Sequence, residues 1–284
     1  MAAIETDEGE IIRKDQPRIR FINLDTAEAR RRYMEGEAAR LGLAFERLPA
    51  VSAATIAPTR AARLNGAWER PLTDAELGCF LSHETLWRDV AEGDGPMLIL
   101  EDDVMLSARL PLVLPALAAT RDVDVLNLES FDRRRFVGRA TRPVGEGQSI
   151  VRLHRDKSGS AAYLLWPSGA RKLLARAERG AAPVDAFLHG LKGLVAFQAE
   201  PALAMQFHIM ERRGRPVPLP SSSSIQAPRR RLPLTVANLP FHRRRLVTQA
   251  KLAGEHLMRL FGRRYRVVDI DEADFAGRFD HSRS

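Results

Sequence analysis

The sequence predicts an α/β fold, a parallel or mixed sheet flanked by helices, from three observations. Strand-like and helix-like segments alternate along most of the chain. Residues 97–101 (MLILE) are entirely apolar up to Glu101, as expected for a strand whose two faces are both covered by helices. Residues 72–95 begin with the capping-box pair Thr73 and Glu76 and end at Gly93 and Gly95, which predicts one long helix.

The other elements are predicted from local pattern. Residues 18–24 (RIRFINL) alternate towards apolar and predict the first strand, and residues 26–42 predict a polar-faced helix ending at Gly42. We then expect a second strand in 43–53, a loop with a short helix to Pro71, a helix over about 107–119, a strand over 122–130, a long arginine-rich loop over 131–148, strands over 149–154 and 160–166, and a helix over 167–178. The Pro-, Ser- and Arg-rich stretch 212–234 should be extended or mobile.

The composition is that of an ordinary globular protein, 45% apolar and 28% charged over 284 residues. A single cysteine, Cys79, excludes a disulfide framework and a cysteine-cluster metal site. The acidic N-terminal segment lacks the apolar core of a secretory signal, and no stretch approaches the roughly 20 apolar residues of a membrane span. We expect a cytoplasmic protein, soluble or peripheral on the inner face of the membrane.

Positive charge is concentrated in one C-terminal segment. The formal net charge is +8, and residues 229–266 hold 11 Lys/Arg against one acidic residue, Glu255. Within 241–266, apolar residues recur at helical spacing among the arginines, which predicts a basic amphipathic helix. Such a helix can lie on an anionic membrane surface or pack on the body of the protein. No recognised nucleic-acid-binding module accompanies the charge, so we expect no specific nucleic-acid partner.

Three consecutive carboxylates, Glu101, Asp102 and Asp103, follow the apolar strand 97–101. In open α/β sheets ligands bind at the carboxyl ends of the strands, and oxygen ligands suit hard cations such as Mg²⁺ or Mn²⁺. Side chains two residues apart in an extended segment project the same way, so Glu101 and Asp103 should face one side and Asp102 the other. The alternative is a solvated acidic turn that caps the helix after it.

The segments ELGCFLSHETLW (76–87) and LILEDDV (98–104) resemble the central signature of glycosyltransferase family 25. The resemblance extends back to FINLDTAEARRRYM and FERLPAVSA, and forward to SGSAAYLLWPSGARKLL, PVDAFL and the pattern of Pro201, Gln206 and 223–225. It covers residues 18–226. We therefore predict a disordered segment over 1–17, a glycosyltransferase domain over 18–226, and a basic extension with an amphipathic helix over 227–284.

The resemblance implies a GT-A-like fold with a mixed, mostly parallel sheet. It also implies inverting transfer of a sugar, usually galactose, from a UDP-sugar to a saccharide or lipid-linked saccharide in lipopolysaccharide or other surface-glycan synthesis. The carboxylate triplet would hold Mn²⁺ or Mg²⁺ against the diphosphate leaving group. The metal ligands expected are Glu101, Asp103 and His208, of which Asp103 is the foremost, and His208 is alternatively an ordinary strand-end histidine.

Residues expected to contact the nucleotide sugar come from three places. The end of the first strand and the helix after it contribute Asn23, Asp25 and Arg30, although a solvated basic stripe is the simpler interpretation of that helix. The 72–95 helix contributes Glu76, Ser82 and His83, of which His83 is alternatively a buried structural histidine. Asp102 is expected on the ribose side. For the base that takes the acceptor proton, Asp185 is the first candidate and Glu129 and Asp132 are rivals; Asp185 is alternatively a helix N-terminal aspartate.

Two other functions remain open from the sequence. A metal-dependent phosphohydrolase or nucleotidyltransferase would also use carboxylates at a strand end, but no nucleophile or phosphate-binding Gly-rich loop accompanies them. A non-enzymatic basic adaptor with a degenerate catalytic site is the second, and the intact carboxylate triplet argues against it.

Overall fold

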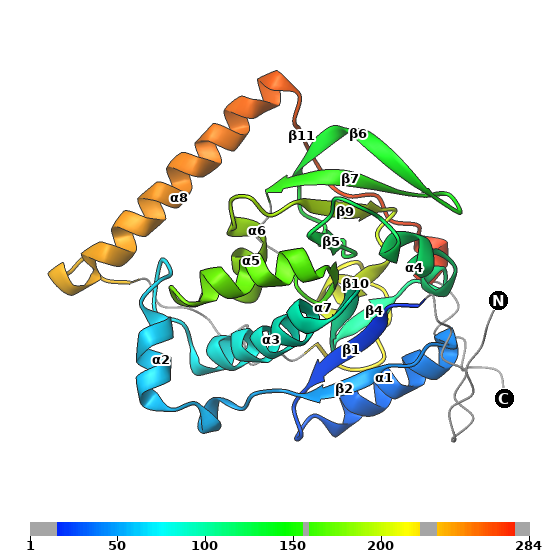
Figure 1. Cartoon of the computed structure of the whole chain (residues 1–284), viewed down its shortest axis with the longest axis horizontal. Helices are drawn as coiled ribbons and strands as arrows, with labels where there is room; N and C mark the ends of the chain where they lie inside the picture. Colours follow the sequence, from blue (N-terminus) through cyan, green and yellow to red (C-terminus); the bar gives the residue numbers. More distant parts are fainter. Residues whose placement is uncertain (1–15, 156–158, 222–231, 276–284) are drawn as a thin grey trace.

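The computed structural model describes residues 16–155, 159–221 and 232–275. Apart from residues 16 and 17, the segment predicted to be disordered lies outside this part. The centre is a nine-stranded sheet in the order β11-β6-β7-β9-β5-β8-β3-β1-β2 (Figure 1). Its strands are β1 (Arg18–Asn23), β2 (Glu46–Pro49), β3 (Met97–Glu101), β5 (Val125–Asn127), β6 (Arg135–Gly145), β7 (Gln148–Arg155), β8 (Ala162–Leu165), β9 (Ala196–Glu200) and β11 (Arg264–Arg266).

The sheet is mixed, which confirms the predicted α/β class. Strand β1 pairs in parallel with β2 and β3, and β5 pairs in parallel with β9, whereas the remaining pairings are antiparallel. A separate antiparallel pair, β4 (Val104–Leu106) and β10 (Ala204–Gln206), lies just beyond the end of β3. The parallel part therefore brings the carboxyl ends of β1 and β3 to the same edge of the sheet.

Helices cover both faces of the sheet (Figure 1). They are α1 (Glu28–Leu41), α2 (Pro58–Asn65), α3 (Asp74–Glu92), α4 (Leu110–Ala118), α5 (Pro167–Ala177), α6 (Val184–Gly190), α7 (Phe207–Arg212) and α8 (Leu239–Leu257). The two faces of the sheet form two hydrophobic cores with different helices. In β3, Met97 and Ile99 pack in the core with α3, α5 and α6, while Leu98 and Leu100 pack in the core with α1 and α4. Each fully buried side chain of this size contributes about 1.5–3 kcal/mol.

Helix α3 forms as the sequence predicts. The Thr73 hydroxyl accepts a hydrogen bond from the Glu76 backbone N–H, and the Glu76 carboxylate accepts one from the Thr73 N–H, which completes the capping box. The inner face buries Phe80 and Trp87, whose rings meet edge to face at 5.5 Å. The helix ends before Gly93, and its buried residues include the polar Glu76, Ser82 and His83.

The long loop predicted over 131–148 is wrong, because residues 135–145 form β6. This strand makes a hairpin with β7 through a turn in which Gly145, Glu146 and Gly147 all have positive φ. Only its first part, Arg135 to Val137, is buried, and residues 138–145 are half-buried or exposed. Arginines on the solvent side therefore hide the alternating pattern by which a strand is recognised.

The helix predicted over 241–266 is also shorter than expected. It runs as α8 from Leu239 to Leu257, continues as a 3₁₀ turn over Met258–Phe261, and stops at Gly262, whose φ is +112°. Strand β11 follows and adds to the edge of the sheet beside β6. No helix among the described residues is long and apolar enough to cross a membrane.

Candidate active site

A cavity of about 1160 Å³ lies at the carboxyl end of β3. Its walls come from α3, the segment before β8, the start of α6, and the β10–α7 junction. Acidic, basic and apolar side chains all line it; the polar ones and the cysteine include Glu76, Cys79, Glu101, Asp103, Arg133, Ser160, Asp185, Gln206, His208 and Arg212. Such a volume is large enough for a ligand of nucleotide-sugar size.

The acidic triplet divides between two sides of the chain, as strand alternation predicts. Glu101 and Asp103 line the cavity. Asp102 points the other way, where its carboxylate accepts hydrogen bonds from Asn23 Nδ2 at 2.7 Å and Arg30 Nη1 at 3.0 Å. The cavity therefore receives two carboxylates from one strand end, while the third is neutralised by an arginine.

Burial and repulsion shift the acidity of these groups. Burial, followed by the charge of Glu101, raises the pKa of Asp103 to about 7. Burial also raises the pKa of Asp102, although Asn23 and Arg30 oppose it. Burial acts in the same direction on Glu101, but His83, Ser160 and Arg30 together outweigh it, so the pKa of Glu101 lies below its usual range. At neutral pH Glu101 is the ionised member of the pair, and Asp103 is close to its midpoint.

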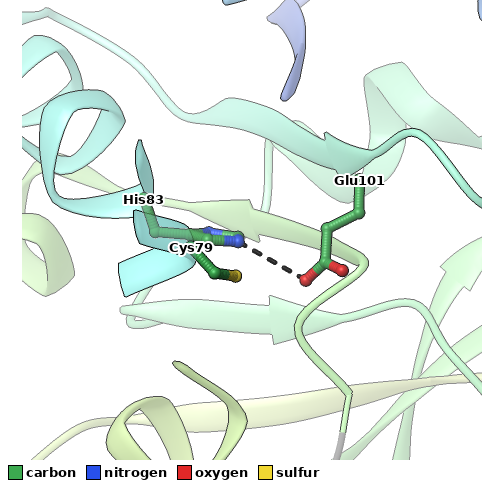
Figure 2. Close-up of side chains that lie close together, drawn as sticks. All are labelled: Cys79, His83 and Glu101. Carbon is green, nitrogen blue, oxygen red and sulfur yellow. Dashed lines mark ion pairs between the residues drawn. The ribbon is translucent and has the colours of Figure 1, made fainter. Parts of the chain in front are cut away.

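A buried hydrogen-bonded chain orients Glu101. Trp87 Nε1 donates to the Tyr163 hydroxyl oxygen at 2.9 Å, and that hydroxyl lies 2.8 Å from His83 Nδ1. Since an indole N–H only donates, the Tyr163 proton is free to serve His83 Nδ1, which leaves the second ring nitrogen to carry hydrogen towards Glu101. His83 Nε2 lies 3.4 Å from Glu101 Oε1 (Figure 2), and Ser160 Oγ donates to the same oxygen at 2.8 Å.

Glu129 lies beneath the cavity rather than in its wall. It is fully buried, and its Oε1 accepts the backbone N–H groups of Ala161 at 2.5 Å and Ala162 at 3.0 Å. Burial, followed by the charge of Glu101, raises the pKa of Glu129 to about 8. Glu129 therefore anchors the segment that leads into β8, and the structure does not bring this predicted base candidate to the cavity.

Comparison with known proteins assigns the family. A family model described as glycosyltransferase family 25 (LPS biosynthesis protein) matches residues 16–188. The chain belongs to glycosyltransferase family 25. The resemblance found in the sequence is thereby confirmed, and the matched range contains the acidic triplet, α3 and Asp185.

Relatives in family 25 carry several names. Human procollagen galactosyltransferase 2 is 30% identical over 168 residues, 51% of this chain and 26% of the relative. The human protein named inactive glycosyltransferase 25 family member 3 is 32% identical over 157 residues, 49% of this chain and 26% of the relative. A putative glycosyltransferase of Haemophilus influenzae is 29% identical over 158 residues, 54% and 55% of the two chains. The chain thus spans about a quarter of the human relatives.

The residues predicted at the end of β1 form a group behind the triplet. Asn23 and Arg30 bind Asp102, and Arg47 Nε donates to Asn23 Oδ1 at 3.0 Å. Asp25 pairs with Arg47, and its side chain is 79% exposed. None of these residues lines the cavity. In this family 25 chain they fix the turn that presents Glu101 and Asp103, and their predicted contact with the nucleotide stays a prediction.

Of the three predicted residues of α3, Glu76 lines the cavity, whereas Ser82 and His83 do not. Glu76 lines the cavity, but its carboxylate is held by Arg70, whose nitrogens lie 2.6 and 2.7 Å from it, and by the capping box. Ser82 is fully buried away from the cavity, where its hydroxyl accepts the Val51 N–H at 2.8 Å. His83 reaches the cavity only through Glu101. Geometry favours Glu76 and His83 as supports, and it does not bring Ser82 to the site.

Of the remaining predicted residues, Asp185 and His208 line the cavity and Asp132 does not. Asp185 lines the cavity at the start of α6, where its carboxylate accepts the Ala186 N–H at 2.7 Å. Asp132 has a positive φ of 54° and pairs with Arg213, whose Nε lies 2.8 Å away, so it does not line the cavity. His208 lines the cavity from α7 rather than from a strand end, with its ring against Phe131 at 5.4 Å. Burial lowers the pKa of His208.

The predicted metal ligands share the cavity without forming a compact group. Glu101, Asp103 and His208 all line it. Within the part of the chain that the structure describes, the His, Cys, Asp and Glu side chains that meet within 4.8 Å are instead Cys79, His83 and Glu101 (Figure 2). Burial, followed by the charge of Glu101, raises the pKa of the Cys79 thiol well above its usual value.

Several cavity residues have no role assigned from the sequence. Gln206 Nε2 donates to Asp103 Oδ1 at 3.2 Å, and Ser160 holds Glu101 in the same way. Arg133 and Arg212 supply positive charge to the wall. Gln206 and Ser160 lie in segments that carry the family resemblance, which is the signal that points to them. Nothing in the sequence separates Arg133 or Arg212 from the many other arginines.

Proposed function

We propose that this protein transfers a sugar, with inversion, from a UDP-sugar to a saccharide acceptor, with a divalent metal ion bound at Glu101 and Asp103. The observation that carries the proposal is the entry of these two carboxylates into one cavity whose wall also contains Arg133 and Arg212. Departure of a nucleoside diphosphate requires cationic stabilisation, which a metal ion and arginines provide. The name of the procollagen galactosyltransferases favours galactose as the sugar.

Glu101 and Asp103 fit a hard cation such as Mn²⁺ or Mg²⁺. Their donors are carboxylate oxygens, the type these ions prefer. The raised pKa of Asp103, caused by burial and then by the charge of Glu101, expresses a repulsion that a divalent ion would relieve. When bound, the ion would act as a Lewis acid on the diphosphate. Ser160 and Gln206 hold the two carboxylates in place, and His208, in the same cavity, is the third ligand we propose.

Asp185 is the base that we propose for the acceptor hydroxyl. An inverting transfer needs one carboxylate to accept the proton of the attacking hydroxyl. Of the three candidates, Asp185 lines the cavity, whereas Asp132 is engaged by Arg213 and Glu129 is buried beneath it.

Calorimetric titration with UDP, with and without Mn²⁺, tests the proposal. We expect UDP binding to the wild type that Mn²⁺ strengthens, and loss of that metal effect in Asp103→Ala. Asp94→Ala is the matched control, because Asp94 is an exposed acidic residue outside the cavity. Metal-independent UDP binding that survives Asp103→Ala would refute the metal site. Absence of nucleotide binding in a folded protein would favour the adaptor alternative.

Helix α8 leads us to propose a membrane-surface location for the reaction. Its apolar stripe faces solvent: Leu246 is 71% exposed, and Leu239, Val247, Leu257, Leu260 and Phe261 are exposed as well. The opposite side is half-buried and rests on the body, where Arg244 Nη1 donates to the Trp68 carbonyl at 3.3 Å. The stripe therefore does not serve packing within the described chain.

Positive charge flanks this stripe. Arg243, Arg245, Lys251 and Arg259 are exposed along α8 and the turn after it, while the acidic Glu255 is paired with Arg263. An apolar stripe bordered by Lys and Arg matches the surface of an anionic bilayer, into which the apolar side chains insert. A lipid-linked saccharide at the inner face of the membrane is the acceptor that this location would supply, in keeping with the description of the family as LPS biosynthesis proteins.

Vesicle flotation tests this location. We expect the full chain to float with phosphatidylglycerol vesicles and not with phosphatidylcholine vesicles, and the double variant Leu246→Ser/Leu257→Ser to bind at least about tenfold more weakly. Gln249→Ser, also exposed on α8, is the control. Equal flotation of all three proteins would overturn the proposal. Self-association abolished by the double variant, without vesicle binding, would assign the stripe to a second copy of the chain.

A further inference from the structure

Three different donor atoms meet at the end of the cavity that lies against α3 (Figure 2). The Cys79 sulfur, a ring nitrogen of His83 and a carboxylate oxygen of Glu101 lie within 4.8 Å of one another. His83 Nε2 and Glu101 Oε1 are 3.4 Å apart, a separation that two ligands of one metal ion can have. Cys79 and His83 come from successive turns of α3, and Glu101 comes from the end of β3.

We propose that Cys79, His83 and Glu101 form a three-ligand site for Zn²⁺, which shares Glu101 with the proposed site of the hard cation. Thiolate, imidazole and carboxylate are the ligand types of zinc, whereas Mg²⁺ and Mn²⁺ prefer oxygen alone. Zinc sites with three protein ligands keep a fourth position for water or substrate. Here that position opens to the cavity, because Cys79 and Glu101 both line it.

The surroundings of His83 support the assignment. The ring is fully buried, and Nε2, which points at the other two ligands, makes no hydrogen bond within normal distance. The other nitrogen, Nδ1, lies 2.8 Å from the Tyr163 hydroxyl oxygen, which can accept its hydrogen. Metal-bound histidines commonly have such a partner on the second ring nitrogen, since it fixes the ring and the tautomer. Ser160 supports Glu101 in the same way.

Binding of zinc has a defined proton balance. The Cys79 thiol loses its proton to solvent through the cavity, and the sulfur becomes a thiolate ligand. The imidazole stays neutral, because its hydrogen changes from Nε2 to Nδ1. One proton is therefore released for each zinc ion. The bound ion also occupies Glu101, which, if the proposed function holds, withholds that carboxylate from Mn²⁺ and weakens Mn²⁺-dependent UDP binding.

Cobalt spectroscopy tests the site directly. Cys79 is the only cysteine of the sequence, so a thiolate-to-cobalt charge-transfer band can arise from it alone. We expect this band to saturate at one equivalent of Co²⁺, to disappear when Zn²⁺ is added, and to be missing in Cys79→Ser. Zinc affinity should fall at least about 100-fold in that variant. A wild-type protein that binds Co²⁺ without the band, or binds none, overturns the proposal.

Variants of Asp103 and Cys79 distinguish failure of the zinc site from failure of the proposed function. Asp103→Asn should keep the cobalt band and lose the Mn²⁺ effect on UDP binding, whereas Cys79→Ser should show the reverse. Zinc should weaken Mn²⁺-dependent UDP binding at least about tenfold in the wild type and not in Cys79→Ser; equal inhibition of both would refute the competition. A cobalt band without any Mn²⁺-dependent UDP binding would refute the proposed function and leave the zinc site standing.

Discussion

Replacement of Asp103 by asparagine should stabilise the metal-free protein at neutral and alkaline pH. The pKa of Asp103 is raised from 3.8 to about 7 by burial and then by the charge of Glu101. The folded state therefore holds this proton more tightly than the unfolded state, so the free energy of unfolding falls as pH rises from about 4 to 7 and is level above that. One pKa unit corresponds to about 1.4 kcal/mol, which sets the full destabilisation at about 4 kcal/mol.

The asparagine variant removes that charge at little steric cost. Its side-chain oxygen can still accept the hydrogen bond from Gln206, which spans 3.2 Å in the wild type. Urea unfolding in the presence of a chelator measures the effect. The advantage of the variant over the wild type should grow by up to about 3 kcal/mol between pH 5 and pH 8. A variant no more stable than the wild type at pH 8, or an advantage independent of pH, would refute this explanation.

Three further variants address the support, the base and the cations of the site. Tyr163→Phe leaves Trp87 Nε1 and His83 Nδ1 without their shared partner, so the free energy of unfolding should fall by about 1–3 kcal/mol and Mn²⁺-dependent UDP binding should weaken, as denaturation and calorimetry would show. Asp185→Asn should lower kcat about 10²–10⁴-fold in a transfer assay while UDP binding is unchanged; an unchanged kcat would exclude it as base. Arg133→Ala should weaken UDP binding more than uridine binding, and equal losses would exclude a diphosphate contact.

Local signals in the sequence were enough for much of the fold. The capping box at Thr73 and Glu76, and the apolar run 97–101, define α3 and β3 because each depends on interactions within a few residues. Strand β6 was missed because its outer half is solvent-exposed and arginine-rich, so pairing with β7 and β11, rather than its own pattern, makes it a strand. The end of α8 was missed because pairing of β11 with β6 is equally non-local.

For the site, alternation predicted which carboxylates share a side. Glu101 and Asp103 line the cavity and Asp102 binds Arg30, as expected, although Asp102 and Asp103 form a turn between β3 and β4, so this turn and not strand alternation sets their directions. Sequence could not predict that Asp132 is engaged by an arginine 81 residues away, or that Glu129 is covered by the segment before β8. Which side chain lines a cavity depends on long-range packing, which spacing along one element does not encode.

Release of UDP from UDP-galactose in the presence of Mn²⁺ tests the central claim most directly. We expect turnover by the wild type that stops on chelation, returns with added Mn²⁺, and falls at least about 100-fold in Asp103→Asn, while that variant is folded and at least as stable as the wild type at pH 8. Turnover of Asp103→Asn equal to that of the wild type, or turnover unaffected by the chelator, would contradict a metal-dependent transfer at Glu101 and Asp103.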